Sequence, residues 1–205
     1  MTNPIFFDQI YPNLPIANSA NQAVRNDFAA TFTQKWPDSS LSQSGYGSDD
    51  LAAMLVASQY LQRLALRHSE DVDPCLSGQA ANQINMAKIH FMASMQSAND
   101  EKAALRAIRI WRGRTALIVA LSDLAGREDM PQQMEWLSEA AQTVLSATIQ
   151  YLFRQTAQRG KIKSFDADLS GCGWTVLALG KLGAGELNFS SDIDLIMLHE
   201  THHAP

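Results

Sequence analysis

The sequence predicts a mostly helical α+β protein. Apolar residues recur at helical spacing through most of the stretch from residue 51 to residue 152. Two short apolar runs follow near the C-terminus, 174–179 and 195–198, and both are shorter than an ordinary helix. A turn containing Gly180, Gly183 and Gly185 separates these runs. We therefore expect helices first, followed by a strand, a glycine turn and a second, buried strand.

Composition excludes several classes of protein. A length of 205 residues is enough for one or two domains with a sizeable core. The net charge of −5, with 18% charged residues, disfavours a nucleic-acid binder, which would carry a basic stripe. No apolar run is long enough for a membrane span, and the N-terminus lacks the basic flank of a signal peptide. We expect a cytoplasmic protein in which Cys75 and Cys172 are free thiols.

The first third of the chain is expected to hold an arm and two helices. Residues 1–50 contain four of the seven prolines, which indicates a loosely attached arm with one helix between 18 and 36. Ser48 is placed to cap the next helix, which the apolar spacing extends to about residue 68. A loop that contains Pro74 and Gly78 should end this helix.

Three longer helices follow, each with an apolar stripe that is typical of core packing rather than of a cofactor site. Asn99 or Asp100 is expected to cap the second of them, and the third is expected from Asp129 to a stop at Arg159 and Gly160. The predicted stripes are Ala80, Ile84, Ala87, Phe91 and Met95 in the first helix; Leu105, Ile108, Trp111, Thr115 and Ile118 in the second; and Met134, Leu137, Ala141, Val144, Thr148 and Leu152 in the third.

Arginines share one face of the second long helix. Arg106, Arg109 and Arg112 are spaced three apart, and Arg114 is displaced from their face. This spacing fits a contact to phosphate or to an acidic partner, and it also fits a solvated face.

An aspartate pair at the start of the second strand is the strongest candidate for chemistry. Asp192 and Asp194 alternate with Ile193, so in a strand both carboxylates would project from one face. A divalent cation relieves the repulsion between them, and magnesium is typically held by one or two carboxylates together with substrate phosphates. The glycine turn before the pair suggests a phosphate cradle.

The same spacing occurs twice more, at Asp71 and Asp73 and at Asp166 and Asp168. Both of these pairs lie among Pro, Ser and Gly, so we interpret them as solvated loop charges. For the third pair, the alternative is a strand-entry pair that faces solvent.

Two overlapping strings resemble known families. Leu179-Gly180, followed some ten residues later by Asp-Ile-Asp-Leu, resembles the signature of the DNA polymerase beta-like nucleotidyltransferase superfamily. The longer string 180–195 resembles the bifunctional glutamine synthetase adenylyltransferase/adenylyl-removing enzyme. Lys181 departs from the superfamily, which has Ser or Gly there, but fits the enzyme family. Ala184 stands where that family mostly has glycine.

The resemblance implies a fold and a set of boundaries. Residues 1–125 would form an arm and a helical region, and residues 126–205 would be the start of a polymerase beta-like nucleotidyltransferase domain with its first two strands. Members of the superfamily usually add a third carboxylate from a later strand, and no apolar run follows Leu198. We therefore expect a part of a longer polypeptide that does not turn over by itself.

The resemblance also implies an activity. Asp192 and Asp194 would hold Mg²⁺, and the phosphate contacts would come from Gly180, Lys181, Gly183, Ser190 and Ser191. One copy of this site in the family transfers AMP from ATP to a tyrosine of glutamine synthetase, and the other removes it with phosphate and releases ADP. The family also responds to the PII signalling protein and to glutamine.

The sequence of the turn favours one of these two copies. The C-terminal copy tends to read Glu-Leu-Gly-Tyr-Gly-Ser-Asp-Leu-Asp, whereas residues 186–194 read Glu-Leu-Asn-Phe-Ser-Ser-Asp-Ile-Asp and lie within the first 200 residues. This pattern resembles the N-terminal, adenylyl-removing copy.

Three alternatives remain open. The chain could act on an antibiotic or RNA as another nucleotidyltransferase of the superfamily, or serve as a helical interaction module without chemistry. A phosphatase or glycosyltransferase with an aspartate pair is the third, although phosphatases of the haloacid dehalogenase type place the apolar strand before the first aspartate. Here the apolar run follows Asp194.

Overall fold

The computed structural model describes residues 19–36, 41, 44–163, 169 and 171–200. Within these residues it contains eight α-helices, one 3-10 helix and two strands, which confirms the mostly helical α+β class. The chain divides into two compact units: residues 1–85 with 116–129, and residues 86–115 with 130–205. The domain boundary expected at residues 125 and 126 stays a prediction.

The first unit is a cluster of short helices around an apolar core. Its helix α2 confirms the helix expected between residues 18 and 36, and Phe28 and Phe32 of that helix are buried with their ring centroids 5.9 Å apart. The elements that lie wholly in this unit are α2 (Ser19–Lys35), α3 (Ser48–Leu55), α4 (Gln59–Arg67), the 3-10 helix η1 (Ser69–Asp71) and α5 (Val72–Leu76).

The helix expected from residue 48 to about residue 68 is two helices. The break between α3 and α4 lies at Ser58, whose hydroxyl accepts a hydrogen bond from the Leu61 N–H at 3.3 Å and so caps the N-terminus of α4. The cap expected at Ser48 is also wrong, since Gly47 is the N-cap and donates its N–H to Asp50 Oδ2 at 2.8 Å. Pro74, expected in a loop, lies within α5.

Asp71 and Asp73 are not the solvated loop charges that we expected. Asp71 ends η1 and is fully buried, while the half-buried Asp73 accepts a hydrogen bond from the Ser44 N–H at 3.0 Å. Buried carboxylates persist where hydrogen bonds offset their loss of water, so this pair has a structural role. Asp166 and Asp168 lie outside the described residues.

Three long helices build the core of the second unit. The helices are α6 (Ala80–Ser97), α7 (Glu101–Leu124) and α8 (Met130–Gln158), and the first two also extend into the first unit. Phe91 stacks on Trp111 with ring centroids 5.6 Å apart, and Trp111 Nε1 donates to the Ala140 carbonyl at 3.2 Å. All five residues of the predicted α6 stripe are buried. The aromatic pair therefore joins all three helices.

The ends of these helices follow the expected capping chemistry. Asp100 caps α7, because its carboxylate accepts a hydrogen bond from the Ala103 N–H at 2.7 Å. The stop expected at Arg159 and Gly160 is also present: α8 ends at Gln158 and Gly160 has a φ of +68°. A positive φ costs glycine least, which is why it commonly follows a helix.

The predicted stripes of α7 and α8 are partly wrong. Leu105 is 43% exposed and Leu152 is 54% exposed, so neither belongs to the core. Along α8 most of the buried residues are displaced from the predicted stripe by about one residue, as Ala140 shows by accepting the hydrogen bond from Trp111 of α7. The buried Ser138 is an exception, because it lies on the other side of the helix and contacts Leu187. The buried residues of α8 are Trp136, Ser138, Ala140, Thr143, Ala147 and Tyr151.

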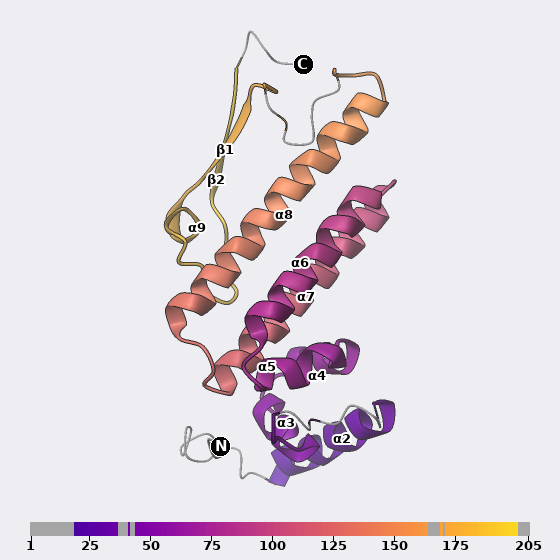
Figure 1. Ribbon diagram of the computed structural model, residues 1–205, viewed down its shortest axis with the longest axis vertical. Coiled ribbons are helices and arrows are strands. Elements are labelled where there is room, and N and C mark those ends of the chain that lie inside the picture. The colour runs from indigo at the N-terminus through magenta and orange to yellow at the C-terminus, as the bar shows by residue number, and fades with distance from the viewer. Residues whose placement is uncertain (1–18, 37–40, 42–43, 164–168, 170, 201–205) are drawn as a thin grey trace. The chain divides into compact units, whose positions relative to one another are not determined.

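A β-hairpin lies alongside α8 (Figure 1). Strand β1 (Trp174–Ala178) pairs antiparallel with β2 (Leu195–His199), with Trp174 opposite His199 and Ala178 opposite Leu195. The Trp174 ring meets Phe153 of α8 edge to face, with centroids 6.1 Å apart. This contact sets one end of the hairpin against the helix.

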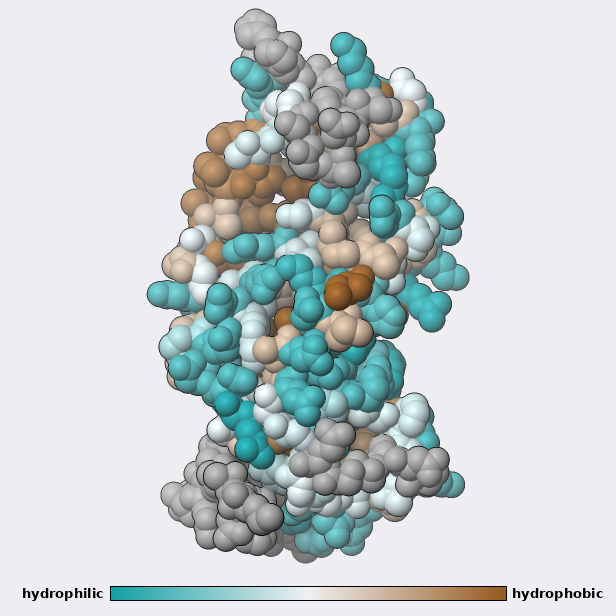
Figure 2. Space-filling model, viewed as in Figure 1, coloured by the Kyte–Doolittle hydropathy of each residue, from teal (hydrophilic) through white to brown (hydrophobic). Residues whose placement is uncertain are grey.

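The strands are not buried as we expected. Alternation places Leu177, Ile196 and Leu198 on one face of the hairpin, and all three are exposed. Figure 2 shows apolar side chains gathered over the hairpin, at the upper left of the view. In the described part of the chain the sheet has two strands, and a two-stranded sheet beside a single helix can bury only one of its faces.

Two further expectations concern the thiols and the membrane. Cys75 and Cys172 are free and buried, as predicted. Among the described residues, every helix is too short or too polar to span a lipid bilayer.

The packing of Trp111 leads to a stability prediction. We expect Trp111→Ala to lower the free energy of unfolding by about 3–5 kcal/mol, since it leaves a cavity between three helices. Trp111→Phe keeps an aromatic ring beside Phe91 but loses the hydrogen bond to Ala140 and part of the ring volume, so we expect a smaller loss of about 1–2 kcal/mol. Urea denaturation measures both values. Equal losses in the two variants would contradict the packing role assigned to the ring.

Candidate functional site

The turn between the two strands contains a short helix, α9 (Gly180–Ala184), where we expected an irregular glycine turn. Gly185 ends it with a φ of +75° and donates its N–H to the Leu182 carbonyl at 3.1 Å. The next N–H, of Glu186, donates to the Lys181 carbonyl at 2.8 Å. These bonds satisfy carbonyl groups at the end of the helix and fix the direction of the chain toward the aspartates.

Two glycines of this turn are required by close approaches. A Cβ atom added at Gly183 would lie 2.5 Å from the Ala178 carbonyl oxygen, so no side chain fits where α9 folds back on β1. Gly180 has a φ of +56°, and a Cβ atom there would lie 3.6 Å from Asp194 Oδ2. The Asp194 carboxylate therefore lies close to the backbone at the start of α9.

The aspartate pair lies before β2 rather than inside it, which corrects the expected placement. The ladder of backbone hydrogen bonds nevertheless extends to Asp194, whose carbonyl accepts from the Leu179 N–H at 2.9 Å. Asp192 and Asp194 are both exposed. Neither side chain has a hydrogen bond or ion pair with any residue that the structure describes. Both carboxylates are therefore open to a ligand.

Asn188 organises the remaining polar groups of the turn, and the sequence reasoning missed it. Its carboxamide oxygen accepts from Lys181 Nζ at 3.2 Å and also from the Ser191 hydroxyl. Ser190 has a φ of +59°, which is unusual for a residue with a side chain. Of the predicted phosphate contacts, Lys181 and Ser191 thus meet at Asn188. The Gly183 N–H is engaged by the Leu179 carbonyl at 3.1 Å.

The turn is anchored on α8 by residues that sequence reasoning also missed. Leu182 and Leu187 are buried, and the Leu187 N–H donates to the buried Ser138 hydroxyl at 3.0 Å. A small polar residue on the apolar side of a long helix was the only sequence signal for Ser138. This anchor positions the segment that carries both aspartates.

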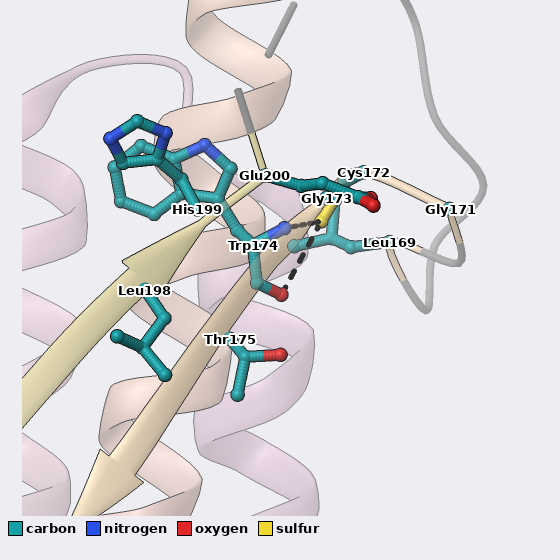
Figure 3. A pocket seen from close by; sticks show the side chains of 9 residues that line it. All are labelled: Leu169, Gly171, Cys172, Gly173, Trp174, Thr175, Leu198, His199 and Glu200. Carbon is teal, nitrogen blue, oxygen red and sulfur yellow. Dashed lines mark hydrogen bonds between the residues drawn. The ribbon is translucent and has the colours of Figure 1, made fainter. Parts of the chain in front are cut away.

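A separate pocket lies at the opposite end of the hairpin. Figure 3 shows the Trp174 and His199 rings stacked there, with centroids 5.9 Å apart. The Trp174 backbone N–H donates to the Cys172 sulfur at 3.4 Å, so the thiol faces the backbone at the start of β1. The register places the length of both strands between this pocket and the aspartates, and the pocket is not part of the candidate site.

The first unit brings together one further group of potential ligands. His68, Glu70 and Asp71 have ligand atoms within 4.8 Å of one another. Glu70 and Asp71 also interact with other residues of the protein, and Asp71 is fully buried. We interpret this cluster as structural.

Comparison with known proteins gives one family and a set of relatives. The sequence profile of the family described as glutamate-ammonia ligase adenylyltransferase matches residues 48–205. Similar curated proteins carry the name bifunctional glutamine synthetase adenylyltransferase/adenylyl-removing enzyme. The protein from Bradyrhizobium diazoefficiens is 42% identical over 106 residues, which cover 51% of this chain and 11% of the relative.

Longer matches reach nearly the whole chain. The protein of the same name from Mesorhizobium japonicum is 32% identical over 164 residues, covering 78% of this chain and 16% of the relative. The one from Bartonella quintana is 28% identical over 203 residues, which cover 96% of this chain and 21% of the relative. The chain thus spans about a fifth or less of the length of these relatives. No solved structure matches it.

The two glycine roles in the turn can be separated by substitution. We expect Gly183→Ala to destabilise the hairpin more than Gly185→Asn, because the first introduces an atom 2.5 Å from a carbonyl oxygen while the second meets open space. Asparagine tolerates the left-handed conformation that position 185 requires. Hydrogen exchange of the turn amides measures the local stability. Faster exchange in Gly185→Asn than in Gly183→Ala would contradict this assignment.

Proposed function

The chain belongs to the glutamate-ammonia ligase adenylyltransferase family, and from that premise we propose that its hairpin carries the adenylyl-removing site of a bifunctional enzyme. The observation that supports this most is that Asp192 and Asp194 are exposed and unpaired, with Asp194 beside Gly180, in a turn that α8 anchors. The proposed substrate is glutamine synthetase that carries AMP on a tyrosine. The proposed co-substrate is inorganic phosphate.

The residues of the site fit a magnesium ion. Both carboxylates are oxygen ligands, both are exposed, and neither is occupied by a basic side chain of the described residues. Magnesium prefers such a set, completed by water and by phosphate oxygens. Asp192 and Asp194 would hold the ion, which supplies positive charge to the phosphates.

The proposed reaction is a phosphorolysis. An oxygen of inorganic phosphate bonds to the phosphorus of the tyrosine-bound AMP, the bond from that phosphorus to the tyrosine oxygen breaks, and ADP and free tyrosine result. Lys181, held toward Asn188, contributes a cation next to the turn. Ser190 and the start of α9 at Gly180 contribute polar groups toward phosphate, and Ser191 keeps the segment ordered through Asn188.

Gly183 has a different part in this scheme from the one that we expected. Its N–H donates to Leu179, so Gly183 serves the site through the close packing of α9 against β1 rather than through a hydrogen bond to phosphate. The chain spans about a fifth or less of the length of its relatives, and we propose that these 205 residues alone bind nucleotide weakly and do not turn over.

The bifunctional names of the relatives support glutamine synthetase as the protein substrate. Regulation by the PII signalling protein and by glutamine is proposed from the family resemblance of residues 180–195. The family match disfavours the alternatives that act on antibiotics or RNA.

The carboxylates should be needed for binding but not for folding. We expect Asp192→Asn and Asp194→Asn to reduce magnesium-dependent ADP binding at least tenfold while changing the free energy of unfolding by less than about 0.5 kcal/mol, because both side chains are exposed. Asp49→Asn removes an exposed, unpaired carboxylate of the first unit and is the matched control. Calorimetric titration measures the binding. Equal effects from all three variants would contradict a site at residues 192 and 194.

The assignment to the adenylyl-removing copy is tested in the complete natural polypeptide that carries this sequence. We expect Asp192→Asn to abolish phosphate-dependent release of ADP from adenylylated glutamine synthetase and to leave ATP-dependent adenylylation intact. Both rates are measured on the same preparation. Loss of adenylylation with retained ADP release would reverse the assignment.

A further inference from the structure

One face of α7 carries a row of basic side chains. Lys102, Arg106, Arg109 and Arg112 are all exposed and lie within the second unit. At 100° per residue these four positions fall within about 120° of one another around the helix. We call them the basic face of α7.

The basic face stands out because no ion pair neutralises it within the described part of the chain. None of its four side chains has a hydrogen bond or an ion pair with any residue that the structure describes. By contrast, Arg114 on the other side of the helix is buried and does have partners. Along the helix, Lys102 and Arg106 are four residues apart, and Arg106, Arg109 and Arg112 are three apart.

Such spacing is unfavourable for a helix that is surrounded only by water. Like charges at these separations destabilise a helix, whereas solvated faces usually alternate acidic and basic residues. The whole protein has an excess of acidic residues, with a net charge of −5, so this local excess of positive charge is not a consequence of composition. Binding an anionic surface would remove the repulsion.

We propose that the basic face of α7 is a docking surface for an acidic surface of the protein substrate. The inference rests on the proposed function, which supplies a macromolecular substrate that must be held while its modified tyrosine reaches the hairpin. It adds a second contact, made by α7, to the site at Asp192 and Asp194.

The dimensions and composition of the face favour a protein over a small anion. Ten residues of helix separate Lys102 from Arg112, which is about 15 Å and more than one phosphate group spans. The exposed Leu105 lies within the same face and offers an apolar contact. Arginine together with apolar side chains is typical of protein interfaces, while charges at their rim accelerate association and make it salt-dependent.

The test compares two triple variants of the complete natural polypeptide. Arg106→Ala/Arg109→Ala/Arg112→Ala removes three charges from the basic face, and alanine preserves the helix. The control, Arg63→Ala/Arg67→Ala/Lys161→Ala, removes three exposed and unpaired charges elsewhere, so both variants have the same net charge. The probe is adenylylated glutamine synthetase with inorganic phosphate and magnesium, studied over a range of salt concentrations.

We expect the first variant to raise KM for glutamine synthetase about tenfold, to leave kcat within about twofold and to lose most of the salt dependence of KM. The control should behave as the wild type. A third variant, Arg106→Lys/Arg109→Lys/Arg112→Lys, keeps the charges and should recover most of the affinity if long-range charge attraction carries the contact. A merely structural role would instead change kcat and thermal stability in the alanine variant.

The outcomes separate this inference from the proposed function. If the wild type releases ADP and the alanine variant has the same KM and the same salt dependence, the docking assignment is wrong. If the wild type releases no ADP, the proposed function is wrong. In that case, direct binding of glutamine synthetase to the wild type and the alanine variant decides the docking question, and equal affinities overturn it.

Discussion

The second unit depends on helix α8 having two different partners on opposite sides. On one side the Ala140 carbonyl accepts a hydrogen bond from Trp111, and Arg154 donates to the Met95 and Ala98 carbonyls at the end of α6. On the other side Ser138 holds Leu187, and Phe153 meets Trp174. Helix α8 thus attaches the hairpin, which could not be stable alone, to the helical core.

This arrangement explains how an exposed hairpin can hold a defined site. Its strands bury little surface, but its turn is fixed by short-range geometry: a left-handed Gly185, a Gly183 without room for a side chain, and backbone bonds that close α9. Leu182 and Leu187 are buried, and the hydrogen bond from Leu187 to Ser138 attaches the turn to α8. The aspartates remain exposed while the backbone that carries them is held in place. A site for a charged ligand requires this combination of ordered backbone and accessible carboxylates.

Charge is distributed unevenly in the second unit. The turn presents the carboxylates of Asp192 and Asp194 as well as the exposed Glu186, and α7 presents the four cations of its basic face. None of these side chains has a partner among the described residues. Uncompensated charge of either sign destabilises the isolated fold slightly, so both groups are better explained by ligands than by folding. Opposite signs suit two ligands of different kinds: a cation with phosphates at the turn, and an acidic protein surface at α7.

The sequence by itself determined the helices α2, α6, α7 and α8, the ends at Asp100 and Gly160 and the motif of the turn, because periodicity, capping and glycine requirements act between residues close together in the chain. It did not separate α3 from α4 or predict the short helices α5 and α9. It could not determine which face of α8 is buried, that Asp71 is buried, or that Ser138 and Asn188 support the site. Those outcomes rest on distant partners: Ser138 contacts Leu187 across 49 residues, and Trp111 contacts Ala140 across 29. Burial is a property of the packed structure, and only the tertiary fold brought these partners together.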